Sequence, residues 1–138
     1  MAKEEEITRN LTMIEYYKEQ LSSIDMQAQY LQAAIADFHK AKITVEQLHK
    51  TSDKSEILIP IGGGTFLNGS LHDTSKVLVD IGAGLVTEKT IEGAVKKINE
   101  RIKTLQENQE KLMEMAQKLQ NEATDLSQRT QQMMNETQ

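Results

Sequence analysis

Cysteine is absent from this 138-residue chain, which excludes disulfides, thiolate metal sites and a cysteine nucleophile. Tryptophan is absent too, and aromatic residues make up only 4% of the sequence. So few large rings argue against a compact globular core and are typical of long helices, each of which buries one narrow stripe. Proline occurs once, so long stretches carry no helix-breaking residue. The length predicts one domain of ordinary size.

Long hydrophobic runs are missing as well. No run approaches the ~20 apolar residues of a transmembrane helix, and the acidic start lacks the apolar core of a signal peptide. The 21 acidic and 16 basic residues give a net charge of −5 and are mixed along the chain, which is typical of solvated helix faces. Binding to a nucleic-acid backbone needs clustered Lys and Arg. We therefore expect a soluble, cytoplasmic protein that binds neither a membrane nor nucleic acid.

Two long segments carry a heptad pattern, whose apolar positions alternate in steps of three and four residues. Residues 4–49 contain no Gly or Pro, and the same pattern runs without a slip through residues 88–136. Such stripes predict a coiled coil with a left-handed supercoil. The seam residues of the first segment are Ile7, Asn10, Ile14, Tyr17, Leu21, Ile24, Ala28, Leu31, Ile35, Phe38, Lys42 and Val45. Those of the second are Ile91, Val95, Ile98, Ile102, Leu105, Gln109, Leu112, Ala116, Leu119, Ala123, Leu126, Thr130 and Met133.

The two helical segments are nearly equal in length, and each would run roughly 70 Å at 1.5 Å per residue. A short connection between helices of equal length predicts that they fold back antiparallel. Residues 1–14 and 126–138 should then share one tip at the end farthest from the connection. Such a rod has no pocket of its own, and its stability comes from the Leu and Ile side chains of the seam.

The connection, residues 50–87, has a different period. Short apolar runs rich in β-branched residues at 56–61, 65–71, 76–81 and 85–88 are separated by "GGG", "HDTS" and "GAG", which predicts two β-hairpins. Pro60 cannot donate a hydrogen bond to a neighbouring strand, so either its strand lies at an edge there or the N–H side of residue 60 faces outward. Two hairpins of this size do not form a stable sheet alone. The sequence therefore predicts that strands from other chains complete the sheet.

The glycines of "IGGGTFLNGS" raise the alternative of a phosphate-binding loop. A dinucleotide-binding fingerprint needs a third glycine where Leu67 stands, followed by a helix and not a strand. A Walker A loop needs Lys directly after its second glycine, and Ser70 follows Gly69. Each near-match lacks the residue that contacts phosphate. We interpret the glycines as turn residues, which supply positive φ at no steric cost.

The sequence gives as little support for a metal site or a catalytic site as for a phosphate-binding loop. His39, His49 and His72 do not have the spacing of metal ligands, and the serines have no His and Asp partners at any motif spacing. We expect no enzyme activity, cofactor or metal. Met133 and Met134 allow two interpretations. They either fill gaps beside the seam or act as soft side chains that bind many apolar partners.

The order helix, two β-hairpins, helix resembles one family over the whole chain. With "EILIPIGGGTFLNGSL" and "KVLVDIGAGLVTEKTIEGA" in the middle, the sequence is similar to the α-class subunit of prefoldin, whose β class has one hairpin. The resemblance implies an α+β fold made of a long antiparallel two-helix coiled coil with two β-hairpins between the helices. It also implies a hexamer of two α and four β subunits, joined by a double β-barrel of hairpins. The arms would hold unfolded proteins at their tips without ATP and pass them to a group II chaperonin.

These expectations name two sets of residues. Clients are expected at the tips, on Ile7, Leu11, Ile14, Leu126, Met133 and Met134. Assembly is expected through the hairpins, on Ile57, Ile59, Ile61, Phe66, Leu71, Val77, Val79 and Ile81. Two other classes stay open: a structural filament in which the hairpins pair with copies of the same chain, and a coiled-coil arm of a larger enzyme.

Overall fold

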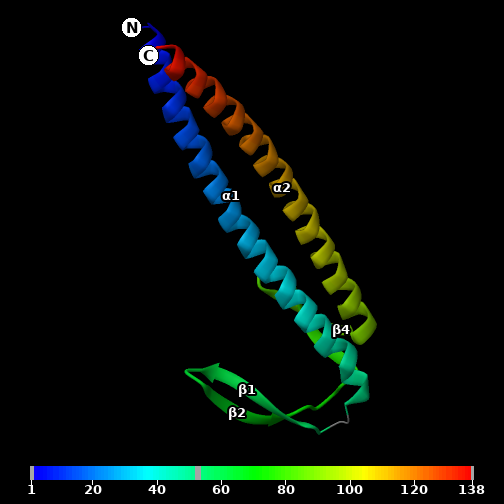
Figure 1. The fold of residues 1–138 in the computed structure, drawn as a ribbon. Coiled ribbons are helices and arrows are strands. Elements are labelled where there is room, and N and C mark those ends of the chain that lie inside the picture. The colour runs from blue at the N-terminus through cyan, green and yellow to red at the C-terminus, as the bar shows by residue number, and fades with distance from the viewer. Residues whose placement is uncertain (1, 52–53, 138) are drawn as a thin grey trace. The chain divides into compact units, whose positions relative to one another are not determined.

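A computed structural model describes residues 2–51 and 54–137. The chain forms helix α1 (Ala2–Gln47), the short 3-10 helix η1 (Leu48–Lys50), strands β1 (Glu56–Gly62), β2 (Thr65–Ser70), β3 (Lys76–Gly82) and β4 (Leu85–Thr90), and helix α2 (Ile91–Glu136). The two long helices are antiparallel and packed together, with two β-hairpins between them in the chain (Figure 1). The predicted fold class is confirmed.

The helix ends differ slightly from the predicted ones, for local reasons. Helix α2 begins at Ile91 because Thr90 ends β4 and caps the helix, its Oγ1 accepting a hydrogen bond from the Gly93 N–H at 3.1 Å. The predicted start at 88 therefore counted three strand residues as helix. Helix α1 ends at Gln47 and tightens into η1, where the Thr51 N–H bonds the Leu48 carbonyl at 3.0 Å. Tightening of this kind satisfies carbonyls that lack an intrahelical partner.

One compact unit consists of α1 up to Ile35 and α2 from Thr104 onward. Ile24 and Ile35 are buried on one helix, and Ala123 and Thr130 on the other. All the seam residues in this unit are buried or half-buried. The heptad pattern therefore identified the packed faces of both helices.

The other compact unit, Ala36–Lys103, holds the remaining helix ends and all four strands. Its buried residues are Ala94, Ile98 and Ile102 of α2. We refer to β1 with β2 as hairpin 1, and to β3 with β4 as hairpin 2. Each is an antiparallel two-stranded sheet.

The two hairpins repeat one another at a shift of 20 residues. Glu56 pairs with Ser70, as Lys76 pairs with Thr90, and the register shifts in both hairpins at the glycine before the turn. The turn residues Gly62, Gly63 and Gly64 all have positive φ, and so do their counterparts Gly82, Ala83 and Gly84. A positive φ favours glycine, which has no Cβ. The glycine-rich stretches are hairpin turns, as predicted.

The pairing decides which side chains share a face of hairpin 1. Ile59 lies opposite Leu67, whereas Phe66 lies opposite Pro60, so Leu67 shares a face with Ile59 and Phe66 lies on the other face. Gly69 leaves room for this arrangement, because a Cβ there would lie 3.0 Å from Cδ1 of Ile59. We define the inner face of hairpin 1 as Ile57, Ile59 and Leu67, and the inner face of hairpin 2 as the equivalent Val77, Val79 and Thr87.

Candidate functional site

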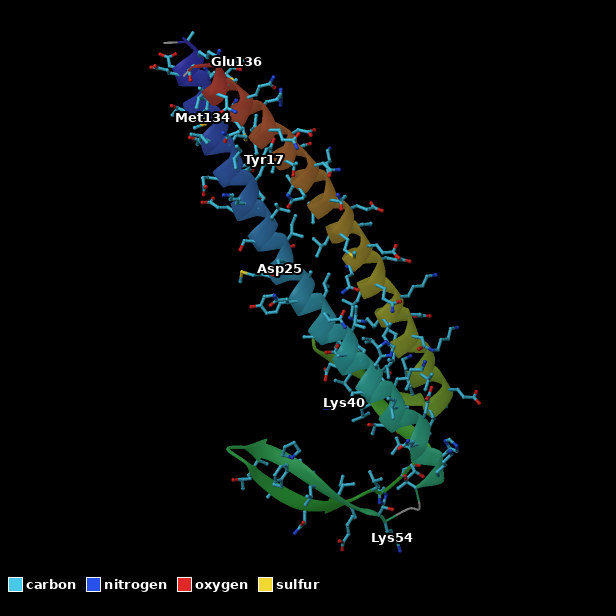
Figure 2. All side chains as sticks on the ribbon, in the orientation of Figure 1. Tyr17, Asp25, Lys40, Lys54, Met134 and Glu136 are labelled. Carbon is cyan, nitrogen blue, oxygen red and sulfur yellow. The ribbon has the colours of Figure 1, made fainter. Side chains whose placement is uncertain are left out.

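The first candidate site is the tip, where the start of α1 meets the end of α2 (Figure 2). Lys3 Nζ lies 3.2 Å from Glu136 Oε2, and Asn10 Nδ2 contacts Met133 Sδ at 4.0 Å. Both contacts are weak, since an exposed ion pair contributes about 0.2–1 kcal/mol and a thioether sulfur is a poor acceptor. The tip is held together mainly by apolar seam residues.

The structure places the six predicted client-binding residues in two groups. Ile7, Ile14, Leu126 and Met133 are seam residues and half-buried, while Leu11 and Met134 are exposed at 46% and 39%. Two of the six are therefore accessible while the helices are closed. The other four are partly covered and become fully accessible only when the end of the coiled coil opens. Client binding by these residues stays a prediction.

Polar residues interrupt the seam close to the tip. Asn10 has a sulfur atom as its partner across the seam. Thr130 is only 2% exposed, and its Oγ1 donates to the Leu126 carbonyl of its own helix at 2.7 Å. This polar layer adds no strong bond between the helices and replaces apolar burial that Leu or Ile would provide. The seam is therefore weaker at this end, which favours opening of the terminal turns.

Tyr17 lies one heptad further along α1 than Asn10, away from the tip. Partial burial raises the pKa of its hydroxyl above 10.0, and the charge of Glu122 and a hydrogen bond to it act in the same direction, while Arg129 opposes them. The neutral form of the phenol is therefore favoured in the folded chain.

A raised Tyr17 pKa predicts a loss of stability at alkaline pH. The neutral phenol is favoured in the folded chain, so its contribution is present below the unfolded pKa of about 10 and disappears as the pH rises through the folded value. Between pH 9 and 11, the free energy of unfolding should fall more steeply for the native chain than for Tyr17→Phe. Urea unfolding followed by circular dichroism measures this difference. Equal slopes in the two chains would contradict it.

The second candidate site is the pair of hairpins. Among the predicted assembly residues, Ile57, Leu71, Val77 and Val79 are half-buried, and Ile59, Ile61, Phe66 and Ile81 are exposed. Sequence reasoning missed further exposed apolar residues on the strands, namely Leu58, Leu67, Leu78, Leu85 and Val86. Regular pairing outward from the turn would place Leu67 opposite Pro60, and only the register shift between Pro60 and Gly62 brings it opposite Ile59. An uncovered apolar surface of this kind marks an interaction site, although assembly through it stays a prediction.

The described residues offer no cluster of side chains for metal binding. In residues 2–51 and 54–137, no group of three His, Asp or Glu residues could hold a metal ion. The Asp73 carboxylate accepts bonds from Ser75 Oγ at 2.6 Å and Ser75 N at 2.8 Å, and these bonds lower its pKa. That arrangement stabilises the turn between the hairpins. Within the same described ranges, neither long helix is apolar enough to cross a membrane.

Comparison with known proteins decides the family. Residues 17–136 match the model of the prefoldin subunit family. This chain belongs to the prefoldin family. The prefoldin subunit alpha of Methanobrevibacter smithii is 31% identical over 106 residues, covering 77% of this prefoldin chain and 72% of the relative. The prefoldin subunit alpha of Thermococcus onnurineus is 43% identical over 68 residues, covering 49% of this chain and 46% of that protein. The chain thus spans about half the length of that relative.

A solved structure supports the same fold. The filamentous prefoldin of Methanocaldococcus jannaschii, determined by cryo-electron microscopy, aligns with a TM-score of 0.74 at 24% identity, covering 82% of this chain and 93% of that one. The relatives of this prefoldin chain include alpha subunits from archaea, in agreement with the two hairpins. The prefoldin family as such is non-enzymatic.

Proposed function

We propose that this chain is the α-class subunit of an ATP-independent holding chaperone. It assembles with β-class subunits through its hairpins, two α with four β, and captures unfolded proteins at its tips in the cytoplasm. It then delivers them to a group II chaperonin. The observation that carries the proposal is the tip, where apolar side chains lie next to a polar layer that weakens the seam.

The energetics of the tip suit a protein that must release what it binds. A fully buried Leu, Ile or Met contributes about 1.5–3 kcal/mol, so the exposed Leu11 and Met134 bind one apolar segment weakly. Opening of the terminal turns adds the half-buried seam residues, at the cost of their own packing. Several tips acting on one unfolded chain gain affinity through effective concentration. Weak contacts in large number give both retention and release.

The hairpins supply the means of bringing several tips together. A two-stranded hairpin is marginally stable alone in water, and both hairpins carry exposed Leu, Ile, Val or Phe side chains. Strands of neighbouring subunits would cover these side chains. A filament of the chain alone is the second candidate, favoured by the presence of uncovered apolar residues on both hairpins of one chain.

An aggregation assay tests the proposed function. The chain, purified with a co-expressed β-class subunit, should suppress light scattering by a protein diluted from denaturant, and the suppression should be the same with ATP, with ADP and without nucleotide. Leu11→Ser with Met134→Ser should weaken it several-fold, because both exposed apolar residues of the tip are lost. Met26→Ser with Met113→Ser is the matched control, since both residues are exposed but lie on the arm away from the tip. Absence of protection by the native complex, or protection that requires ATP, would overturn the proposal.

A further inference from the structure

Met133 is the one methionine in residues 2–51 and 54–137 that lies at a seam position. It is half-buried at the tip. The other methionines of these ranges lie outside the seam and are exposed, namely Met13, Met26, Met113, Met115 and Met134. A chemical change of the Met133 sulfur therefore alters the packing between the helices, while the same change elsewhere alters only the surface.

The Met133 sulfur lies across the seam from an amide donor. Asn10 Nδ2, on a side chain that is also half-buried, is 4.0 Å from Met133 Sδ. The neighbouring Thr130 hydroxyl is engaged elsewhere, because its Oγ1 donates to the Leu126 carbonyl at 2.7 Å. A thioether sulfur accepts hydrogen bonds only weakly. The Asn10 amide therefore has a partner in position but gains little from it.

Oxidation to the sulfoxide supplies the strong acceptor that this pair lacks. Hydrogen peroxide transfers one oxygen atom to a lone pair of the sulfur: the O–O bond breaks, an S–O bond forms and water is released, so the sulfur loses the two electrons that the peroxide gains. Thiol-dependent sulfoxide reductases reverse the step, with a disulfide and water as products. Because the methionine side chain is unbranched and flexible, the new oxygen can turn toward the Asn10 amide and reach the ~2.7–3.2 Å of an N–H···O bond.

We propose that Met133 is a reversible oxidation site, whose sulfoxide accepts a hydrogen bond from the Asn10 amide and holds the tip closed. The bond joins the two helices in the polar layer, where the reduced chain has only the weak contact to sulfur. Peroxide then keeps the half-buried seam residues of the tip covered, and a reductase releases them again. The effect on clients rests on the proposed client binding at the tip, whereas the bond itself does not.

Asn10 decides the direction of the effect. A sulfoxide is polar, and a polar group in an apolar seam costs free energy unless it has a hydrogen-bond partner. The Asn10 amide is that partner on the opposite helix. Oxidation of Met133 should therefore stabilise the closed tip in the native chain and destabilise it in Asn10→Leu.

Amide hydrogen exchange in the terminal turns tests the bond. The starting chain carries Met13→Leu, Met26→Leu, Met113→Leu, Met115→Leu and Met134→Leu, so that Met133 is the seam methionine left to oxidise. Hydrogen peroxide should slow exchange in these turns about three- to tenfold, the equivalent of one net hydrogen bond. Mass spectrometry of the C-terminal peptide measures the extent of oxidation. Adding Met133→Leu should remove the response, and adding Asn10→Leu should reverse its sign.

The outcomes separate the bond from the proposed function. Unchanged or faster exchange after oxidation, an equal response in the Asn10→Leu chain, or a Met133 that stays reduced would overturn the proposal. In the complex with a β-class subunit, oxidation should raise the concentration needed for half-maximal protection of a client several-fold, and a thiol-dependent sulfoxide reductase should restore it. Slower exchange with undiminished protection would keep the bond between Met133 and Asn10 and overturn client binding by an opened tip.

Discussion

Replacing Ile59 and Leu67 together by aspartate should abolish the oligomer and leave the two helices intact. Both residues lie on the inner face of hairpin 1 and are exposed in the single chain, so carboxylates there remain solvated in the monomer. In the assembly they would be taken out of water without partners, a cost of several kcal/mol per charge. Two apolar side chains of about 1.5–3 kcal/mol each are lost as well. Since 1.4 kcal/mol is a factor of ten in affinity, the affinity between subunits should fall more than a thousandfold.

Size-exclusion chromatography with light scattering measures the mass, and circular dichroism the helical content. Met26→Asp with Tyr30→Asp is the matched control, because both residues are exposed on the arm and no strand pairs with them. Val79 is a poorer test site than Ile59, since it is half-buried beside the chain's own helices. A double variant that elutes as a full-size complex would refute assembly through hairpin 1. A native chain that elutes alone as an extended polymer would instead support the filament.

Deleting residues 1–10 and 127–138 should preserve assembly and remove protection of an unfolding client. The deletion takes away Lys3, Asn10, Met133 and Met134, together with the buried Thr130. All four strands and the buried Ile24 stay in place. Because binding is the sum of several weak apolar contacts, losing most of each tip should raise the concentration needed for half-maximal protection at least tenfold. Light scattering of a client diluted from denaturant measures this concentration.

A less drastic double variant separates loss of client contacts from loss of arm length. Asn10→Leu with Thr130→Leu keeps the arm at full length but replaces the polar layer by apolar residues that close the seam. This variant should slow amide exchange in the last turns and weaken protection, since Ile7 and Met133 then stay covered. Undiminished protection by the truncated chain, assembled as before, would move client binding away from the tip.

The sequence was informative where one periodicity covers many residues. A heptad stripe repeats the same requirement every seven positions, so the pattern alone identified the seam residues of both helices, including the polar Asn10 and Thr130. Element ends were less certain, because Thr90 serves both as the last residue of β4 and as the cap of α2. Nothing in the run "LVTEKTIEGA" reveals which of the two roles stops the strand.

The hairpin faces could be predicted only in part. Which residues of the second strand of each hairpin share a face with those of the first depends on the pairing register. An extra residue before each glycine turn shifts the pairing, which moves Phe66 to the opposite face and brings Leu67 beside Ile59. The expectation that the rod has no pocket of its own was wrong, because residues of both helices, among them Ile43 and Val95, line an open groove of about 1180 Å³. The heptad pattern describes the packed faces of the helices and not the space beside them.

The ion pair between Lys3 and Glu136 joins residues 133 positions apart, whereas each hairpin closes within one short turn. Contacts between residues close in sequence form first, because little loop entropy opposes them. During synthesis from the N-terminus, the hairpins can therefore pair while the end of α2 has not yet been made. The contacts at the tip therefore form after those of the hairpins, and the strands that we propose for assembly can pair before the arm is complete.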